Sequence, residues 1–211
     1  MKHLRQKSKN QNRDMNKKFF LIFLLTVVGI SIVARLLPHP PNFTPIAAVA
    51  LFAGAYASKI SKWYLLAPLA AMLVSDLFIG LYEWEIMAVV YASFFVIGLF
   101  GLLVRKYKSA TWRIGAITLA ALTGSILFYL TTNFAVWAFS GMYAPTLGGL
   151  LLSYYMALPF FKFTLLGDLF YVALFFGAYG LITSLSYRYR YKPATAVYSH
   201  SVVPGGLGVM S

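Results

Sequence analysis

Acidic side chains are rare in this chain, and two of them lie inside long apolar segments. Asp76 follows Leu73-Val74-Ser75, about five residues from the outer end of its predicted span, and Asp168 lies about five residues into the apolar run Phe163 to Tyr187, so we expect the two acids at similar depths. An ionisable side chain within a membrane span costs several kcal/mol unless it is paired or hydrated, so each acid is a candidate functional residue. Two carboxylates would suit a cation or a hydroxylated, nitrogenous ligand.

Five further residues with polar groups stand at or just beyond the ends of apolar runs that we expect to reach the outer side. They are Arg35, His39, Asn42, Asn133 and Trp137. Together with the two acids they form the predicted substrate-binding set. The alternative is structural, because intramembrane acids also pair with basic side chains such as Arg35 or Lys162, or with backbone donors, to hold helices together. His39 lacks the partner ligands that a metal site requires, so no metal site is predicted.

The composition indicates that a membrane surrounds the elements that position these residues. Of the 211 residues, 60% are hydrophobic and only 11% are charged, against roughly 25% charged residues in soluble domains. Apolar runs between charges and turn residues predict six transmembrane helices near 19–37, 46–57, 63–81, 86–104, 114–137 and 163–187. The second run is short for a full crossing unless Asn42 to Pro45 also lies at membrane depth, packed against protein.

The distribution of Lys and Arg predicts the orientation of these spans. With six spans and an inner N-terminus, the short loops and tails place 16 basic residues inside and only Arg35 and Lys162 outside. The predicted domains are a basic cytoplasmic tail over 1–18, a six-helix transmembrane domain over 19–190, and a flexible cytoplasmic tail over 191–211. The first span reads as an uncleaved signal anchor, because its apolar run is too long for a signal peptide.

A seventh apolar run, 147–161, either spans the membrane or re-enters it. Counting it as a span would change the distribution of basic residues to 14 inside and 4 outside. We therefore expect an outer-leaflet re-entrant or interfacial segment that ends near Pro159. The expected fold is an all-α membrane protein with six transmembrane helices.

Several functional classes are disfavoured by what the sequence lacks. The chain has no cysteine, which excludes disulfides and thiolate chemistry. The metalloprotease, nucleophile-elbow and P-loop motifs are absent, so we expect neither an enzyme nor a cofactor. The net charge of +13 is concentrated at the ends of apolar runs, which indicates topology rather than nucleic-acid binding.

Small residues follow the proline-rich loop at spacings of three and four. Ala47, Ala50 and Ala53 would leave one face of a helix nearly flat, and such a face permits close helix contact. The contact could be internal packing or the binding surface for a partner protein.

The segment Arg35-Leu36-Leu37-Pro38-His39-Pro40-Pro41-Asn42-Phe43-Thr44-Pro45-Ile46-Ala47-Ala48 resembles the opening of a bacterial integral-membrane family of unknown function that is classed with transport proteins. Further matches are Ala67-Pro68-Leu69, Ser75-Asp76, Gly124-Ser125, Thr132-Asn133-Phe134, Trp137, Tyr143 to Leu147, Leu158 to Phe161 and Gly167-Asp168. The resemblance covers about residues 33 to 180. That family is similar to the substrate-binding S components of energy-coupling-factor (ECF) transporters.

This resemblance implies a multi-pass protein of the bacterial inner membrane that binds a small polar solute or micronutrient from the outer side. It further implies that Ala47, Ala50 or Ala53 contacts a transmembrane coupling subunit that works with ATPases. The alternative hypothesis is a non-transporting structural or assembly subunit of a larger membrane complex. Both hypotheses expect membrane lipid around the helices, and only the first expects a solute.

Overall fold

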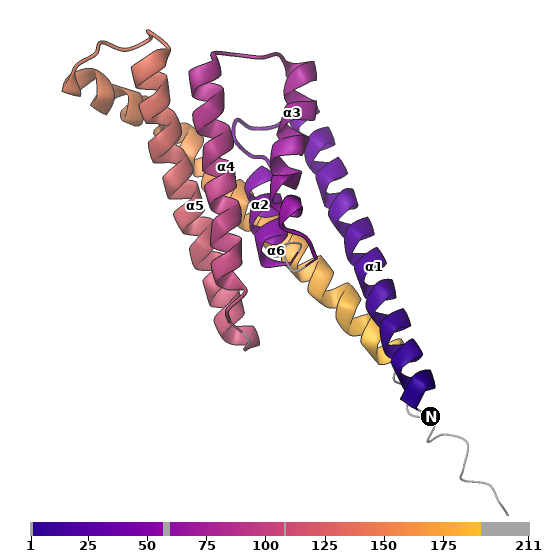
Figure 1. The fold of residues 1–211 in the computed structure, drawn as a ribbon. Coiled ribbons are helices and arrows are strands. Elements are labelled where there is room, and N and C mark those ends of the chain that lie inside the picture. Colours follow the sequence, from indigo (N-terminus) through magenta and orange to yellow (C-terminus); the bar gives the residue numbers. More distant parts are fainter. Residues whose placement is uncertain (1, 57–59, 108, 191–211) are drawn as a thin grey trace, which may run out of the picture. The chain divides into compact units, whose positions relative to one another are not determined.

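The computed structural model describes residues 2–56, 60–107 and 109–190. These residues form helices joined by loops, without strands, which confirms the predicted all-α class (Figure 1). The elements in chain order are α1 (Lys2–Leu36), α2 (Ile46–Ala55), the 3₁₀ helix η2 (Lys62–Leu66), α3 (Ala67–Ile79), α4 (Trp84–Val104), α5 (Ala110–Phe139) and α6 (Leu147–Arg190). The chain divides into two compact units, Met1–Gly177 and Ala178–Ser211, and the helix packing and cavities considered below belong to the first.

Five helical segments are long and apolar enough to cross a membrane. They are Lys17–Leu36, Lys62–Ile79, Trp84–Val104, Ala110–Phe139 and Leu147–Ser186. Each has at least the 17 or so residues that a hydrocarbon core of about 30 Å requires. The chain is therefore a multi-pass membrane protein. The predicted tail over 191–211 lies outside the described residues.

The short helix α2 lies in the middle of the first unit, between α3 and α4 (Figure 1). All ten of its residues are buried. The proline-rich loop before it also enters the protein, because Pro45 is less than 2% exposed and the ring of Phe43 packs at a tilt against Phe170 and Tyr171 of α6. α2 is therefore a half-helix that begins inside the bundle, where protein rather than lipid surrounds the irregular backbone.

Glycines allow the backbones of α2 and α4 to touch. A Cβ atom added to Gly54 would lie 2.0 Å from the carbonyl oxygen of Gly98, and one added to Gly101 would lie 2.3 Å from that of Leu51. Contacts this close between helices are typical of small residues in membranes.

The predicted partner-binding alanines belong to the same packed core. Ala47 is 5% exposed, and Ala50 and Ala53 are fully buried. These alanines lie inside the bundle, because α3, α4 and α5 pack against α2, and contact between them and a partner protein stays a prediction. Internal packing, the other interpretation of this small-residue run, accounts for all three.

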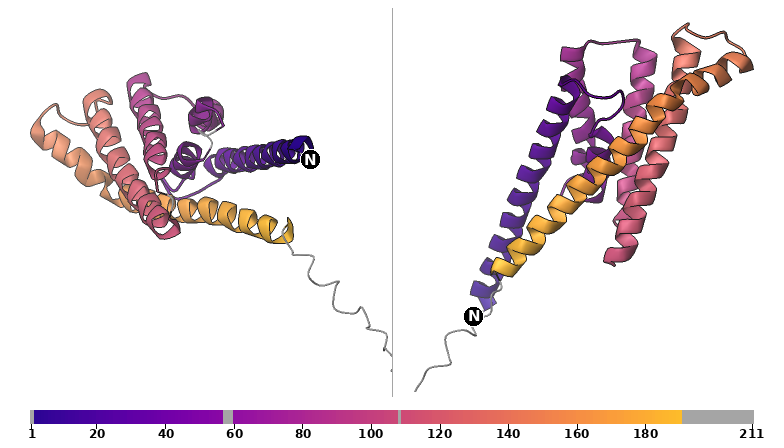
Figure 2. Two further views of the ribbon diagram at one scale, coloured as in Figure 1. Left: turned by 60° about the horizontal axis from the view of Figure 1, so that its bottom comes forward. Right: turned by 180° about the vertical axis from the view of Figure 1, so that it is seen from behind.

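Helix α6 differs from the prediction of a separate segment over 147–161. It continues through Pro159 as one helix of 44 residues. Pro159 cannot donate a backbone hydrogen bond to Tyr155, but neighbouring helices make such a loss tolerable in membrane helices. Seen from behind, α6 up to Gly177 runs obliquely across α2, α4 and α5 (Figure 2).

The contact between α2 and α4 leads to a prediction about stability. We expect Gly54→Ala and Gly101→Ala each to destabilise the protein by about 1–3 kcal/mol or more, since the new methyl group meets backbone rather than a flexible side chain. Thermal unfolding in detergent would measure this loss. The control is Gly115→Ala in α5, where an added Cβ meets no atom within 4 Å. Equal melting temperatures for all three variants would contradict the packing described.

Candidate functional site

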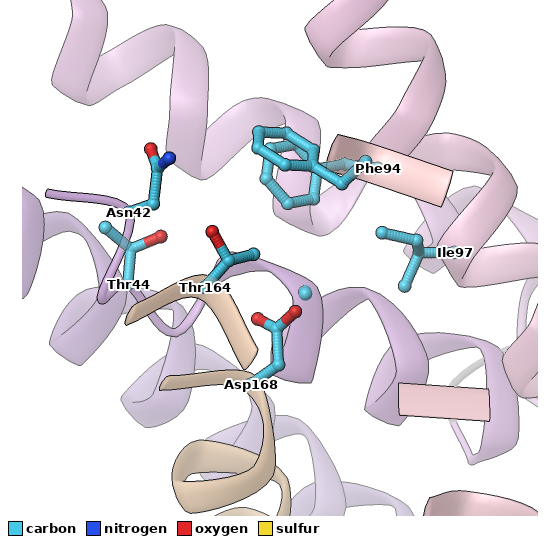
Figure 3. Close-up of a pocket in the computed structure, with 8 residues that line it drawn as sticks. Asn42, Thr44, Phe94, Ile97, Thr164 and Asp168 are labelled. Carbon is cyan, nitrogen blue, oxygen red and sulfur yellow. The ribbon is translucent and has the colours of Figure 1, made fainter. Parts of the chain in front are cut away.

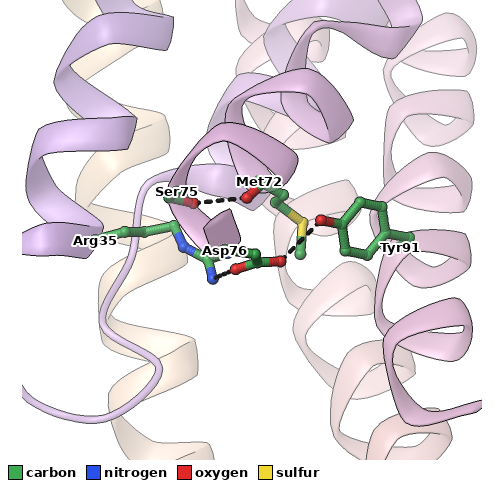
Figure 4. Close-up of polar contacts among 5 residues, drawn as sticks. All are labelled: Arg35, Met72, Ser75, Asp76 and Tyr91. Atoms are coloured by element: carbon green, nitrogen blue, oxygen red, sulfur yellow. Dashed lines mark hydrogen bonds and ion pairs between the residues drawn. The ribbon is translucent and has the colours of Figure 1, made fainter. Parts of the chain in front are cut away.

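Asp76 lies in an ion pair that joins three helices. The Arg35 guanidinium at the end of α1 donates through Nη2 to Oδ1 of Asp76 on α3, and the Tyr91 hydroxyl of α4 donates to Oδ2 at 2.8 Å (Figure 4). The side chain of Asp76 is 1% exposed and that of Arg35 is 16% exposed. Both carboxylate oxygens thus have donors, and the charge has a counter-charge. For Asp76 the geometry therefore matches the alternative to substrate binding, in which the acid pairs with Arg35 to hold helices together.

Tyr82, in the loop between α3 and α4, lies close enough to this pair to respond to it. Burial raises the pKa of the Tyr82 phenol; the Asp76 carboxylate raises it further, and the Arg35 guanidinium opposes the rise. The loop between α3 and α4 is therefore part of the electrostatic environment of the Arg35–Asp76 pair. Tyr82 is nevertheless 40% exposed.

Asp168 lies in a different environment, although it is equally buried. It is 4% exposed, and the Ser125 hydroxyl of α5 donates to its Oδ2 at 2.6 Å. Within the described part of the chain, no cationic side chain lies within ion-pair distance of it, Lys162 included. Its second oxygen, Oδ1, has no donor among these residues either.

The two acids also lie at different depths. Asp76 meets α4 at Tyr91, whereas Asp168 lies by Phe94 and Ile97, which are about one to two helical turns further along α4. The sequence suggested equal depths because α6 was expected to begin near residue 163. Since α6 begins at Leu147, Asp168 lies more than 20 residues into the helix.

A small cavity of about 20 Å³ adjoins Asp168 (Figure 3). Its polar lining consists of Asp168 and Thr164 from α6 together with Asn42 and Thr44 from the proline-rich loop. Asn42 adopts a left-handed backbone conformation with a φ of 61°, which asparagine tolerates better than most residues. This turn brings the loop to the cavity.

A larger cavity of about 220 Å³, here named the chamber, adjoins the small one and shares Asn42, Phe128 and Thr164 with it. The chamber lies between α4, α5 and α6. Its other polar groups are Tyr129, Thr132 and Asn133 of α5, and the rest of its lining is apolar. Few polar groups in an apolar concavity are typical of small-molecule sites.

Hydrogen bonds between α5 and the first part of α6 frame the chamber. The Tyr129 hydroxyl donates to the carbonyl of Tyr154 at 2.7 Å, and the Ser153 hydroxyl donates to the carbonyl of Asn133 at 3.0 Å. The ring of Tyr129 packs on Phe161 with centroids 4.7 Å apart. The segment that seemed re-entrant from the sequence thus builds one wall.

The predicted substrate-binding residues fall into three groups. Asn42, Asn133 and Asp168 line the two adjoining cavities, so three of the seven lie together. Arg35 and Asp76 form the ion pair, away from these linings. His39 Nδ1 lies 2.6 Å from the carbonyl oxygen of Leu37, and Trp137 Nε1 donates to the carbonyl of Ala144, so these two contact neighbouring loop backbone.

The sequence analysis did not single out Ser125, Thr164 or Tyr91. Hydroxyl residues are common in membrane helices, where they bond to the carbonyl four residues earlier, as Thr164 does to Phe160. Only the rotation of each helix decides which of them faces an acid. The one available signal was Gly124-Ser125, which the sequence analysis noted only as part of a resemblance.

The Arg35–Asp76 pair leads to a second prediction. We expect Arg35→Ala to cost about 3–5 kcal/mol of stability, because it leaves a buried carboxylate without its counter-charge. Adding Asp76→Asn to that variant should restore part of the loss, and a double-mutant cycle from thermal unfolding would measure the coupling. Lys162→Ala, which removes an exposed charge with no ion pair to a described residue, is the control. Additive losses from the two substitutions would contradict a direct pair.

Comparison with known proteins identifies a family but no function. No curated protein and no solved structure matches the chain. A family model described as a family of unknown function, DUF6580, matches residues 13–194. Because this match covers most of the chain, the protein belongs to the DUF6580 family.

Proposed function

We propose that the protein is a membrane transport protein that binds a small polar solute in the chamber. The observation that carries the proposal is the convergence of polar groups from α5, α6 and the proline-rich loop on one cavity inside a membrane protein. Asn42 and Asn133 would orient the solute through hydrogen bonds. Phe128 and Tyr129 would cover its apolar parts.

The size of the chamber fits a small solute. Its volume of about 220 Å³ is far above the roughly 10–15 Å³ that one ordered water requires, and below the roughly 300–1,000 Å³ of sites for drug-sized ligands. A polar solute of modest size is thus favoured over a lipid or a large cofactor. The side-chain amides of Asn42 and Asn133 carry both donors and acceptors, which suits hydroxyl or nitrogen groups.

The proposed location is the bacterial inner membrane, with both termini in the cytoplasm. The excess of Lys and Arg in loops predicted to be inner supports this orientation. Asn133 lies near the end of α5 that would then face outward, so the solute would enter from the outer side.

The prediction of a coupling subunit with ATPases remains a prediction. The chain itself has no P-loop motif, so active transport would need a partner or an ion gradient. Docking through Ala47, Ala50 and Ala53 is not part of the proposal, because these residues are buried.

Ligand binding to purified protein would test the proposal. A library of small polar solutes, including amines, polyols and water-soluble vitamins, would be tested by thermal shift and native mass spectrometry. We expect a ligand that raises the stability of the wild type, by about 2.7 kcal/mol at 100 times its dissociation constant. The substitution Ala157→Phe fills the chamber from a buried position and should abolish this shift.

The matched control is Met156→Phe, which adds an aromatic ring at the neighbouring, half-exposed position of α6. It should leave the ligand shift unchanged because Met156 does not line the chamber. Binding that survives in Ala157→Phe would place the solute elsewhere. If no compound binds and the protein is recovered from membranes only with a non-transport complex, the structural-subunit alternative would replace the proposal.

A further inference from the structure

The two buried acids differ in how their charge is balanced. Asp76 has a guanidinium partner and a phenol donor. Asp168, at greater depth, has one neutral hydroxyl donor among the described residues. An unpaired charge inside the membrane is expensive, so the charge of Asp168 calls for a partner that is not a side chain of the described protein.

The protein supplies part of that balance through its backbone. Helix α2 begins at Ile46, and Ala47 lines the small cavity. The N-terminus of a helix carries roughly half a positive elementary charge. A full carboxylate charge would still leave roughly half a negative charge at the cavity, which attracts a cation; a monovalent ion would leave a net charge of roughly +0.5 there, and a divalent ion roughly +1.5.

The small cavity has the size and the atoms for such an ion. Its volume of about 20 Å³ suffices for one particle the size of water, which requires roughly 10–15 Å³. Oxygen atoms are available from Asp168, Thr164, Thr44 and Asn42. Figure 3 shows these side chains around one space, with Phe94 and Ile97 closing the opposite side.

We propose that the small cavity binds a monovalent cation, either Na⁺ or a proton on Asp168, and that this cation enters together with the solute. The evidence for the cation site is the unbalanced carboxylate of Asp168 and the oxygen lining of the small cavity. The linkage to solute rests on the proposed function. In transporters, sites near the middle of the membrane lie at interrupted helices, whose N-termini point at anionic groups and whose unwound carbonyls hold the coupling ions.

The two cavities share the residues that such a linkage needs. Asn42, Phe128 and Thr164 line both, so a cation that orders Asn42 or Thr164 also shapes the chamber. Besides Asp168, the side chains that face the small cavity from α2, α4, α5 and the loop are alanine, phenylalanine, isoleucine, threonine and asparagine, none of which titrates. Ser125, its hydrogen-bond donor, does not titrate either.

Binding of ²²Na⁺ to the purified full-length protein would test the site directly, with choline chloride holding the ionic strength constant. We expect saturable binding to the wild type and roughly 10- to 100-fold weaker binding to Asp168→Asn, which retains the shape but loses the charge. Thr164→Val should weaken binding less. Lys162→Ala, which removes an exposed charge from the same helix, should bind as the wild type does.

A second measurement decides between the two cations and guards against misfolding. If Na⁺ does not bind, the melting temperature is measured across a pH series without Na⁺. It should depend on pH in the wild type and much less in Asp168→Asn. That result would identify the bound cation as a proton on Asp168. The proposal is overturned if the wild type and folded Asp168→Asn respond alike to both Na⁺ and pH. If the cation proposal is overturned but a solute still binds in the chamber, the proposed function stands. If Na⁺ binds but no solute binds in the chamber, only the cation site stands.

Discussion

Direct backbone contact between α2 and α4 determines where the polar groups of this protein lie. Gly54 and Gly101 remove the side chains that would separate the two helices. As a result, a helix of only ten residues is fully buried in the bundle. Because α2 is too short to reach across a membrane, the proline-rich loop before it must descend into the protein. Thr44, which is partly buried, and Asn42, which is still exposed, therefore line the cavity by Asp168.

This constraint explains why two acids in similar sequence contexts have different surroundings. Asp76 lies near the loop between α3 and α4, within reach of Arg35 at the end of α1. Asp168 lies deeper, where the descending loop brings amide and hydroxyl groups but no cation among the described residues. The first arrangement joins helices, and the second leaves a negative centre beside a cavity. Chemistry that needs an exchangeable partner is therefore favoured at Asp168.

Composition and apolar run length were sufficient to predict the membrane class and most helices, because a bilayer requires long apolar segments and satisfied backbone groups. The course of α6 was not predictable in the same way. Pro159 usually marks a helix end in water, but contacts such as that between Tyr129 and Tyr154 hold α6 against α5 on its N-terminal side. That error placed Asp168 too close to the outer surface.

The candidate site was predictable only in part. The acids and asparagines stand out because they are rare in apolar runs, and Asn42, Asn133 and Asp168 line adjoining cavities. Which hydroxyl faces which acid depends on helix rotation, so Ser125 and Tyr91 could not be assigned from spacing. The alanines of α2 illustrate the same limit, because a flat helix face looks alike whether its partner is α4 or another protein.

The central claim is that the chamber is a solute-binding cavity reached from the outer side, and the absence of cysteine from the chain makes a direct test simple. A Thr132→Cys variant would carry one thiol in the chamber, and a Leu119→Cys variant would carry one on an exposed apolar position of the same helix. In intact cells, a small cationic, membrane-impermeant thiol reagent should modify the Thr132→Cys variant and leave the Leu119→Cys variant unmodified. Modification of the Thr132→Cys variant only after the cells are permeabilised would contradict the account.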